Sequence, residues 1–287
     1  MSYAYVTLVM KGDKYIPGAL VLAESLKSVH AKYPLICMVT NDVSSSAREA
    51  LLKKYDNVVT VPYIHKKSIR MNSAKQAKIY GSWIEQSYTK WNILNKDLFP
   101  YDKVLFVDAD MIFIQNCDHL FNLQAPALTF SSPWAVPYKN NGIFNPYGEV
   151  EHGKTIDSSL IIKGFSSIIG ISSLVLISPN TDVMKKFKSI IDENPIYGHR
   201  GCINGVDEQS IVETYISIGA TFTHIHQQYN WLVGKHNWLI NGETPKTYHY
   251  YNTKPWEQNR NEWPDLAIWY AHVDHLCLDK SFRIWFP

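Results

Sequence analysis

Short apolar runs alternate with segments of helical periodicity through the first half of the chain. Leu22 and Leu26 repeat at helical spacing after Pro17, and a serine run at 44–46 precedes a second helical pattern that continues through Leu52. The apolar runs have the length of buried strands and lie at residues 5–9, 35–40 and 58–61. Strands that alternate with helices in this way predict βαβ units and a mainly parallel sheet.

The same two patterns continue along the rest of the chain. They predict helices over 79–91, 183–191 and 207–218, and strands over 103–107 and 174–177. Residues 131–158 carry Pro, Asn, Gly and Tyr without periodicity, which is typical of a long loop over a site. We therefore predict an α/β fold with a mainly parallel sheet, and the length allows one large domain or two small ones. A Trp- and Pro-rich extension over residues 257–287 is expected to pack on the outside of the sheet.

Composition and charge narrow the class of protein. Lysine and arginine number 28 against 26 aspartates and glutamates, and this near-neutral balance argues against a nucleic-acid partner. The four cysteines lie far apart, and the N-terminus has no signal-peptide pattern. No apolar stretch reaches the roughly 18 to 20 residues that cross a bilayer. We expect a soluble, cytoplasmic protein without a membrane span.

The sharpest local feature is Asp108-Ala109-Asp110, at the end of the apolar run 103–107. In extended backbone, residues two apart point to the same side, so the two carboxylates should converge. Ligands of α/β sheets bind at the carboxyl ends of strands. All-oxygen ligation favours Mg²⁺ or Mn²⁺, and an added imidazole favours Mn²⁺. A solvated turn with two acidic side chains is the alternative.

Other motifs carry chemistry only in combination. His249 could complete a metal site and Lys254 could hold a diphosphate, but a plain surface loop is the better explanation of this motif taken alone. Asp207 and Glu208, followed by Gln209, either favour the start of a helix or face a sugar. Tyr15 either stacks on a base or packs in the core. Lys90 either reaches toward phosphate or extends along its own helix.

The order of these motifs resembles the glycogenin-like family of retaining glycosyltransferases (family 8, GT-A fold). The resemblance covers about residues 3 to 256, and its most specific parts are the Asp-x-Asp motif and His249…Lys254-Pro255-Trp256. The chain looks closer to plant glucuronyltransferase-like and baculoviral members than to glycogenin, which is compatible with a viral protein in a host cytoplasm. The resemblance implies one GT-A, Rossmann-like nucleotide-binding domain over residues 1–256. It would divide into a donor-binding half, about residues 1–115, and an acceptor half, about residues 116–256.

The resemblance implies transfer of a hexose-type sugar from a UDP-sugar to a hydroxyl of a glycan or protein acceptor, with homodimers compatible with the family. Mn²⁺, with Mg²⁺ as the alternative, would be held by Asp108, Asp110 and His249. The catalytic group would be Asp207, Glu208 and Gln209, with Glu208 as the sugar-facing acid. The nucleotide sugar would be bound by Thr7, Leu8, Tyr15, Lys90, Ala109, Ser172, Ser173, Asn252 and Lys254.

Departures from the family pattern leave the donor sugar open. Ile171-Ser172-Ser173 stands where the family has Asn-Ser/Ala-Gly, and Asn252 stands where Gly is usual. A sugar nucleotidyltransferase would need a Gly-rich loop, for which residues 10–13 are a poor candidate. A sugar-binding protein without transfer activity is the other alternative, although all three metal ligands are kept. Aromatic residues that would suit an acceptor platform are Trp134, Tyr138, Tyr147, Trp231 and Trp238.

Overall fold

The computed structural model describes residues 1–67, 78, 81–130, 151–156, 158–159, 161, 170–193, 206–234, 244–251, 253–260 and 264–286. They form two compact units, each built from separate stretches of chain. The β1 unit, named after strand β1 (Tyr3–Val9), comprises Tyr3–Val61, Leu105–Asn122 and Gln228–Pro287. The β8 unit, named after strand β8 (Gly170–Ile177), comprises Met1–Ser2, Pro62–Val104 and Leu123–Gln227.

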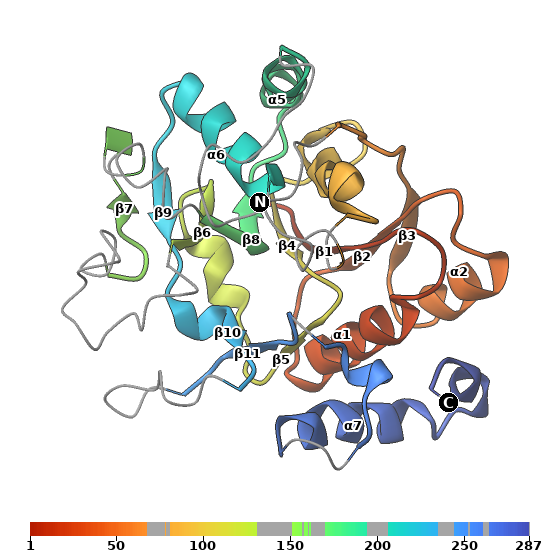
Figure 1. The fold of residues 1–287 in the computed structure, drawn as a ribbon. Coiled ribbons are helices and arrows are strands. Elements are labelled where there is room, and N and C mark those ends of the chain that lie inside the picture. Colours follow the sequence, from red (N-terminus) through yellow and green to blue (C-terminus); the bar gives the residue numbers. More distant parts are fainter. Residues whose placement is uncertain are drawn as a thin grey trace. The chain divides into compact units, whose positions relative to one another are not determined.

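The strands of the β1 unit follow the order β3-β2-β1-β4. β2 (Leu35–Val39) lies between β1 and β3 (Asn57–Thr60) and pairs with both in parallel. β4 (Lys103–Val107) follows β1 in this order. The helices α1 (Ile16–Ser28) and α2 (Ser45–Leu52) connect the first three strands (Figure 1). Their carboxyl ends therefore lie along one edge, where ligands of α/β sheets bind.

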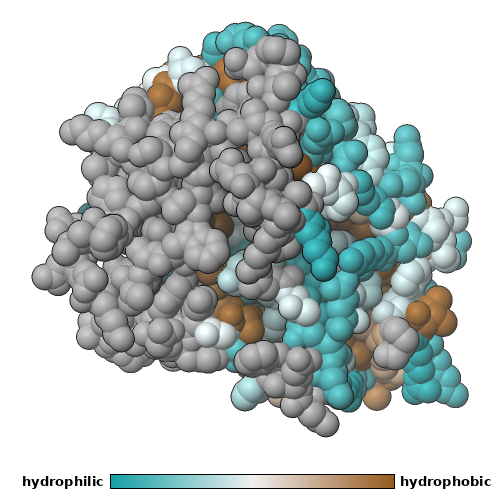
Figure 2. Space-filling model, in the orientation of Figure 1, coloured by the Kyte–Doolittle hydropathy of each residue, from teal (hydrophilic) through white to brown (hydrophobic). Residues whose placement is uncertain are grey.

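Helix α1 is buried from Ile16 to Leu26 because its apolar residues are not confined to one stripe. Pro17 stands in its first turn, where a missing N–H costs nothing. Figure 1 shows α7 (Pro264–Leu276) beside α1, and the two helices contact each other. α7 is followed by the 3₁₀ helix η6 (Lys280–Trp285). Leu52, Leu278 and Ile284 are exposed hydrophobic side chains of this unit. Figure 2 shows a few hydrophobic patches among hydrophilic residues on the face in view.

A small second sheet in the β1 unit brings distant segments together. β11 (Thr247–His249) pairs antiparallel with β5 (Met111–Phe113) and parallel with β10 (Trp231–Leu232). In this register His249 lies opposite Met111, the residue after Asp110. The 3₁₀ helices η2 (Asp118–Asn122), η3 (Gln227–Tyr229) and η5 (Pro255–Glu257) flank these strands.

The β8 unit contains a mixed set of strands in the order β8-β6-β9-β7. β6 (Ala127–Phe130) pairs antiparallel with β8 and parallel with β9 (Phe222–His224), and β7 (Thr155–Ile156) pairs antiparallel with β9. Its helices are η1 (Ile84–Leu94), α5 (Thr181–Asp192) and α6 (Val206–Ser217). The side chain of Asn180 accepts hydrogen bonds from the first turn of α5, which fixes where that helix begins.

Most predicted elements are confirmed, with shifts of a few residues at their ends. The strand predicted over 103–107 is β4, and Ser44 caps α2 by accepting a hydrogen bond from Ala47 N at 3.1 Å. The α/β class with a mostly parallel central sheet is confirmed as well. The C-terminal extension contains α7, which the Trp- and Pro-rich composition did not predict. The predicted domain boundaries stay predictions.

The helix predicted over 79–91 differs, because the structure has the 3₁₀ helix η1 over Ile84–Leu94. Two side chains explain the tighter winding. Ser87 Oγ donates to Ile84 O at 2.7 Å, and Asn92 Nδ2 donates to Thr89 O at 2.8 Å. Such local hydrogen bonds compete with the α-helical backbone pattern and favour turns closed over three residues. Among the described residues, no helix is both long and apolar enough to cross a bilayer.

Candidate functional site

Two carboxylates and an imidazole converge in the β1 unit. Asp108 and Asp110 lie on the turn between β4 and β5, and His249 is the last residue of β11. The register of β11 against β5 places His249 there, and Tyr250 N donates to Asp110 O at 3.0 Å. One ligand atom from each of the three side chains lies within 4.8 Å of the other two. Among the described residues, this is the one group of three His, Cys, Asp or Glu side chains with such spacing.

Hydrogen bonding prepares both His249 and Asp110 to bind a cation. His249 Nδ1 lies 3.1 Å from the amide oxygen of buried Asn230, which can accept its proton, and Nε2 lies 3.5 Å from Asp110 Oδ1. A second hydrogen bond of this kind orients most metal-ligating histidines. Asp110 Oδ1 is buried and accepts no hydrogen bond from the described part of the chain. These residues therefore fit a divalent cation with oxygen and nitrogen ligands.

Lys254 neutralises the other oxygen of Asp110. Its Nζ lies 2.5 Å from Asp110 Oδ2 and also donates to the carbonyl oxygens of Tyr250 and Tyr251, at 3.0 and 3.1 Å. Burial alone would raise the pKa of the Asp110 carboxyl, but Lys254 and then His249 hold that pKa below its ordinary value. Asp110 is therefore an anion inside the cluster.

Tyr15 and Trp256 border the cluster. Their rings meet edge to face with centroids 5.3 Å apart, and Lys254 Nζ lies 5.9 Å from the centre of the Tyr15 ring. Burial first, and then the charges of Asp110 and Asp108, raise the pKa of the Tyr15 hydroxyl, so Tyr15 stays neutral. Tyr15 is the residue before α1 and is half-buried. The structure thus brings the predicted base-stacking residue beside the predicted metal ligands.

Gly18 allows two segments of the cluster to approach each other. A Cβ atom on Gly18 would lie 2.4 Å from Ala109 O and 2.7 Å from the Trp256 ring, closer than such atoms pack. Any side chain at position 18 would therefore push the Asp-x-Asp turn or Trp256 away. Gly18 and Asn230 were not predicted as site residues from the sequence. The only sequence signal for Gly18 is its place beside Pro17 in the first turn of α1.

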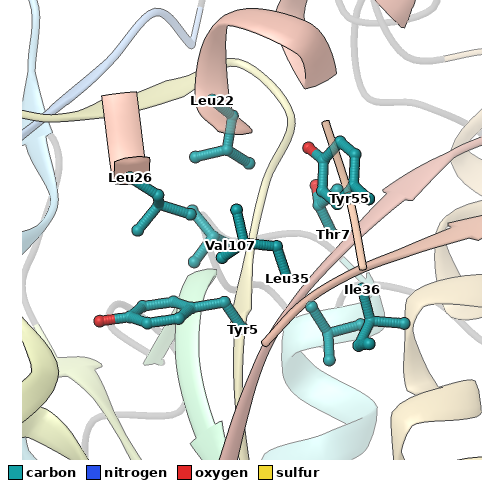
Figure 3. Close-up of a pocket in the computed structure, with 9 residues that line it drawn as sticks. Tyr5, Thr7, Leu22, Leu26, Leu35, Ile36, Tyr55 and Val107 are labelled. Carbon is teal, nitrogen blue, oxygen red and sulfur yellow. The ribbon is translucent and has the colours of Figure 1, made fainter. Parts of the chain in front are cut away.

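Two predicted binding residues, Thr7 and Leu8, lie on β1. The Thr7 side chain is buried and lines a small pocket between β1, β2 and α1 with Leu22 and Tyr55, as Figure 3 shows. This pocket of about 10 Å³ is large enough for one water at most, so it is not a nucleotide site. Asn252 lies outside the described residues.

A second polar cluster lies in the β8 unit, around the hydroxyl of Ser172 on β8. Lys90 Nζ, from η1, lies 2.9 Å from Ser172 Oγ and 3.1 Å from Asp207 Oδ2. Ser172 Oγ lies 3.0 Å from Glu208 Oε1 and 3.3 Å from Asp207 Oδ2, and one hydroxyl proton serves only one of these carboxylates at a time. The hydroxyl group therefore links the lysine to both acids.

The remaining predicted residues of this unit lie around the same cluster. The backbone carbonyl of Asp207 accepts a hydrogen bond from Trp91 Nε1 at 3.2 Å, and Gln209 Nε2 donates to Glu213 Oε1 at 3.1 Å. Ser173 is buried next to Ser172. The sequence suggested that Lys90 approaches phosphate, whereas the structure pairs it with Asp207.

Only one of the proposed acceptor platforms falls within the described residues. Trp231 is 3% exposed and packs with Leu232, Tyr248 and Tyr251 in a hydrophobic cluster. A side chain this deeply buried offers no surface for stacking, so the interpretation of Trp231 as a platform is wrong. Trp134, Tyr138, Tyr147 and Trp238 lie outside the described residues.

The chain is similar in sequence to known glycosyltransferases over its first half. Residues 7–138 match the family model described as glycosyl transferase family 8. Among curated proteins, "Uncharacterized protein R707" of Acanthamoeba polyphaga mimivirus is 34% identical over 138 residues, which are 48% of this chain and 46% of that protein. UDP-glucuronate:xylan alpha-glucuronosyltransferase 2 of Arabidopsis thaliana is 31% identical, over 49% of this chain and 21% of that protein. The Caenorhabditis elegans glycogenin-1 is 29% identical, over 50% of this chain and 32% of that protein.

The whole chain is similar in fold to solved structures of one enzyme. An active-site mutant of LgtC matches with a TM-score of 0.59 and 12% identity, covering 94% of this chain and 95% of LgtC. The galactosyltransferase LgtC in complex with donor and acceptor sugar analogs matches with a TM-score of 0.55 and 14% identity, at the same coverage. In sequence, the chain covers less than half the length of the curated relatives named above. The fold is therefore GT-A, and residues 7–138 are similar to glycosyl transferase family 8.

Proposed function

We propose that this chain is a metal-dependent, retaining glycosyltransferase that moves a hexose-type sugar from a UDP-sugar to a hydroxyl group of a glycan or protein acceptor. The observation that carries the proposal is the cluster of Asp108, Asp110 and His249 in a family 8 sequence. Relatives support the donor class, since one is a UDP-glucuronate-dependent glucuronosyltransferase by name. LgtC, which shares the fold, was solved with donor and acceptor sugar analogs.

The three clustered residues would hold Mn²⁺, with Mg²⁺ as the alternative. Two carboxylates suit either ion, and the imidazole of His249 favours Mn²⁺. A divalent cation there supplies a Lewis acid that neutralises charge on the departing diphosphate. Asp110 Oδ1 supports this assignment, because it is buried and accepts no hydrogen bond from the described residues, which is costly for a carboxylate oxygen unless a cation binds it.

Further predicted residues would bind the rest of the donor. Tyr15 would stack on the uracil, with the backbone of Thr7 and Leu8 beside it and Ala109 near the ribose. Lys254 would neutralise phosphate, and Lys90 would act through Asp207 and Ser172. Toward the sugar we assign the residues that the family resemblance implies, namely Asp207, Glu208, Gln209, Ser173 and Asn252.

The reaction exchanges one bond at the anomeric carbon for another. The acceptor oxygen forms a bond to that carbon while the bond to the diphosphate oxygen breaks, and UDP leaves with the electron pair. We favour attack on the same face, with the departing diphosphate oxygen accepting the acceptor proton. Glu208 or Asp207 would stabilise positive charge on the sugar as the bond breaks. A covalent intermediate would require a carboxylate at the anomeric carbon, and we assign none.

A screen of UDP- and GDP-sugars tests the proposal. We expect one UDP-sugar to bind in the presence of Mn²⁺ and to release UDP slowly into water, with both effects lost in chelator. Asp110→Asn should lose Mn²⁺-dependent binding and reduce turnover by at least about a hundredfold. Asp182→Asn is the matched control, because Asp182 is 88% exposed and pairs with Lys185 across one helical turn.

The outcomes separate the alternatives. Metal-dependent binding of a nucleotide sugar without UDP release would favour a binding protein that lacks transfer activity. Formation of a nucleotide sugar from a sugar phosphate and UTP would favour a nucleotidyltransferase. Normal turnover by Asp110→Asn would remove the metal assignment.

A further inference from the structure

We infer that Lys254 is an internal counter-ion of the metal cluster, and that it couples the binding of the cation to the binding of the diphosphate. The ammonium group occupies Asp110 while the cluster holds no cation, and it moves to phosphate when a cation takes the carboxylate. This inference rests on the proposed function, because it names how the same site orders its two ligands. It goes beyond a role for Lys254 as a fixed phosphate ligand.

The hydrogen bonds of Lys254 leave it no capacity for a further ligand. A lysine ammonium has three N–H donors. In the structure they are used by Asp110 Oδ2 at 2.5 Å, Tyr250 O at 3.0 Å and Tyr251 O at 3.1 Å. The Lys254 side chain is 11% exposed, so solvent does not compete for it. To bind phosphate, Lys254 must therefore give up one of these three partners.

Charge decides which partner it gives up. Asp110 is the only anion among the three, and its second oxygen, Oδ1, is the buried atom aimed at His249 Nε2. A divalent cation bound by Oδ1 and His249 would share the carboxylate with an ammonium group already in contact with Oδ2. Two positive groups on one carboxylate repel each other, and burial strengthens that repulsion. The neutral carbonyl oxygens of Tyr250 and Tyr251 impose no such conflict.

A diphosphate relieves this conflict because it brings negative charge for both cations. A metal ion that binds alone is therefore repelled by the charge of Lys254. When a diphosphate binds as well, its negative charge attracts both the metal ion and Lys254. Coupling of this kind is reciprocal, so each ligand should raise the affinity for the other by the same factor. A merely structural lysine, which ties residues 250–251 to the Asp-x-Asp turn, would not produce that behaviour.

Removing the charge of Lys254 should change the two affinities in opposite directions. We expect Lys254→Met to bind Mn²⁺ about tenfold more tightly than the wild type when no nucleotide is present, measured by calorimetry or by the loss of free Mn²⁺ signal in electron paramagnetic resonance. The same variant should bind UDP about tenfold more weakly at saturating Mn²⁺. Lys254→Arg, which keeps the charge, should retain the coupling between the two ligands. Lys14→Met is the control, since Lys14 is 65% exposed and pairs with Glu257 in the same unit.

Unchanged or weaker Mn²⁺ binding by folded Lys254→Met, in a protein whose wild type binds both ligands, would overturn the inference while leaving the proposed function in place. Failure of the wild type to bind Mn²⁺ or UDP would overturn both. If Lys254→Met does not fold, the wild type still provides a test through the ¹⁵N signal of its lysine ammonium group. Addition of diamagnetic Mg²⁺ without nucleotide should shift or broaden the Lys254 signal, and a signal that does not respond to saturating Mg²⁺ contradicts displacement.

Discussion

Each of the two units buries an aspartate–lysine pair, and the two aspartates differ in the other partners of their carboxylate oxygens. In the β1 unit, Lys254 contacts one oxygen of Asp110, and the other oxygen accepts no hydrogen bond from the described residues. In the β8 unit, Lys90 and the Ser172 hydroxyl both lie against Asp207 Oδ2. The Ser172 hydroxyl connects the Lys90–Asp207 pair to Glu208. In the Lys254–Asp110 pair, by contrast, the second oxygen of Asp110 faces the imidazole of His249 and could bind a cation.

This difference teaches that a buried ion pair by itself is weak evidence for a binding site. Structural pairs and ligand-binding pairs have the same charges and similar distances. The atoms that the pair leaves without partners distinguish them, because buried polar groups are normally satisfied. On this criterion Asp110 fits a cation-binding site. Asp207 belongs to a network that positions Glu208.

The largest expected effect is on folding, through Asp207. Asp207→Asn should lower the free energy of unfolding by about 3 kcal/mol, because Lys90 would stay buried after losing its ion pair with Asp207. Asp110→Asn should cost less, because Lys254 keeps two carbonyl acceptors, and Mn²⁺ should no longer stabilise the variant. Urea unfolding with and without Mn²⁺ measures both effects. If Mn²⁺ restores the stability that Asp207→Asn loses, the cation binds in the β8 unit, and the contrast between the two aspartate–lysine pairs is wrong.

A smaller effect is expected at Ser172. Ser172→Ala should cost about 1 to 2 kcal/mol of unfolding free energy, since it removes a buried hydroxyl that bridges charged groups. It should also lower the rate of UDP release from the donor more than it weakens Mn²⁺-dependent UDP binding, because Glu208 loses a hydrogen-bond partner. Ser189→Ala is the control, as Ser189 donates to Glu193 on an exposed helix surface at 2.9 Å. Equal losses of UDP affinity and rate would assign Ser172 to nucleotide binding instead.

The smallest effect is expected at Glu24, which forms a third buried pair, with Lys54 at 2.8 Å and with His275. Burial would raise the pKa of the Glu24 carboxyl, but its hydrogen bonds to Lys54 and His275 hold that pKa below its ordinary value of 4.5. Its stabilising contribution is therefore complete above pH 4.5 and is lost as the pH falls through the folded-state pKa.

Glu24→Gln should thus cost about 1 kcal/mol at neutral pH and progressively less in acid. Unfolding curves of the wild type and Glu24→Gln between neutral pH and pH 3 give this difference directly. Glu49→Gln, on the exposed face of α2, serves as the control. A difference that stays constant with pH would show that the contribution of Glu24 comes from packing rather than charge.

Local signals predicted the parts of the fold whose causes are local. The apolar run of β4 and the Ser44 cap of α2 depend on neighbouring residues, and both are confirmed. The winding of η1 depends on side-chain hydrogen bonds from Ser87 and Asn92. A pattern of hydrophobic positions carries no information about such bonds. β11 has only three residues, and its partner β5 is more than a hundred residues away in the chain, so no local pattern predicts it.

The candidate site was predictable as a set of residues but not as a set of contacts. Asp108, Asp110 and His249 converge as the motif order indicated. The partners of these residues were not predicted: Asn230 on His249, and two backbone carbonyls on Lys254. Backbone carbonyls carry no sequence signal, and an isolated Asn among aromatic residues has no distinctive pattern.

The pairing of β11 with β5 has a consequence for the order in which the protein matures. His249 reaches Asp110 only after the chain closes a loop of well over a hundred residues, and closing such a loop is slow compared with forming the helices. A cation that requires both residues will therefore not bind a nascent or partly folded chain. Its binding free energy will stabilise only the fully folded protein. Metal binding would then mark the completion of folding, and early intermediates would stay free of metal.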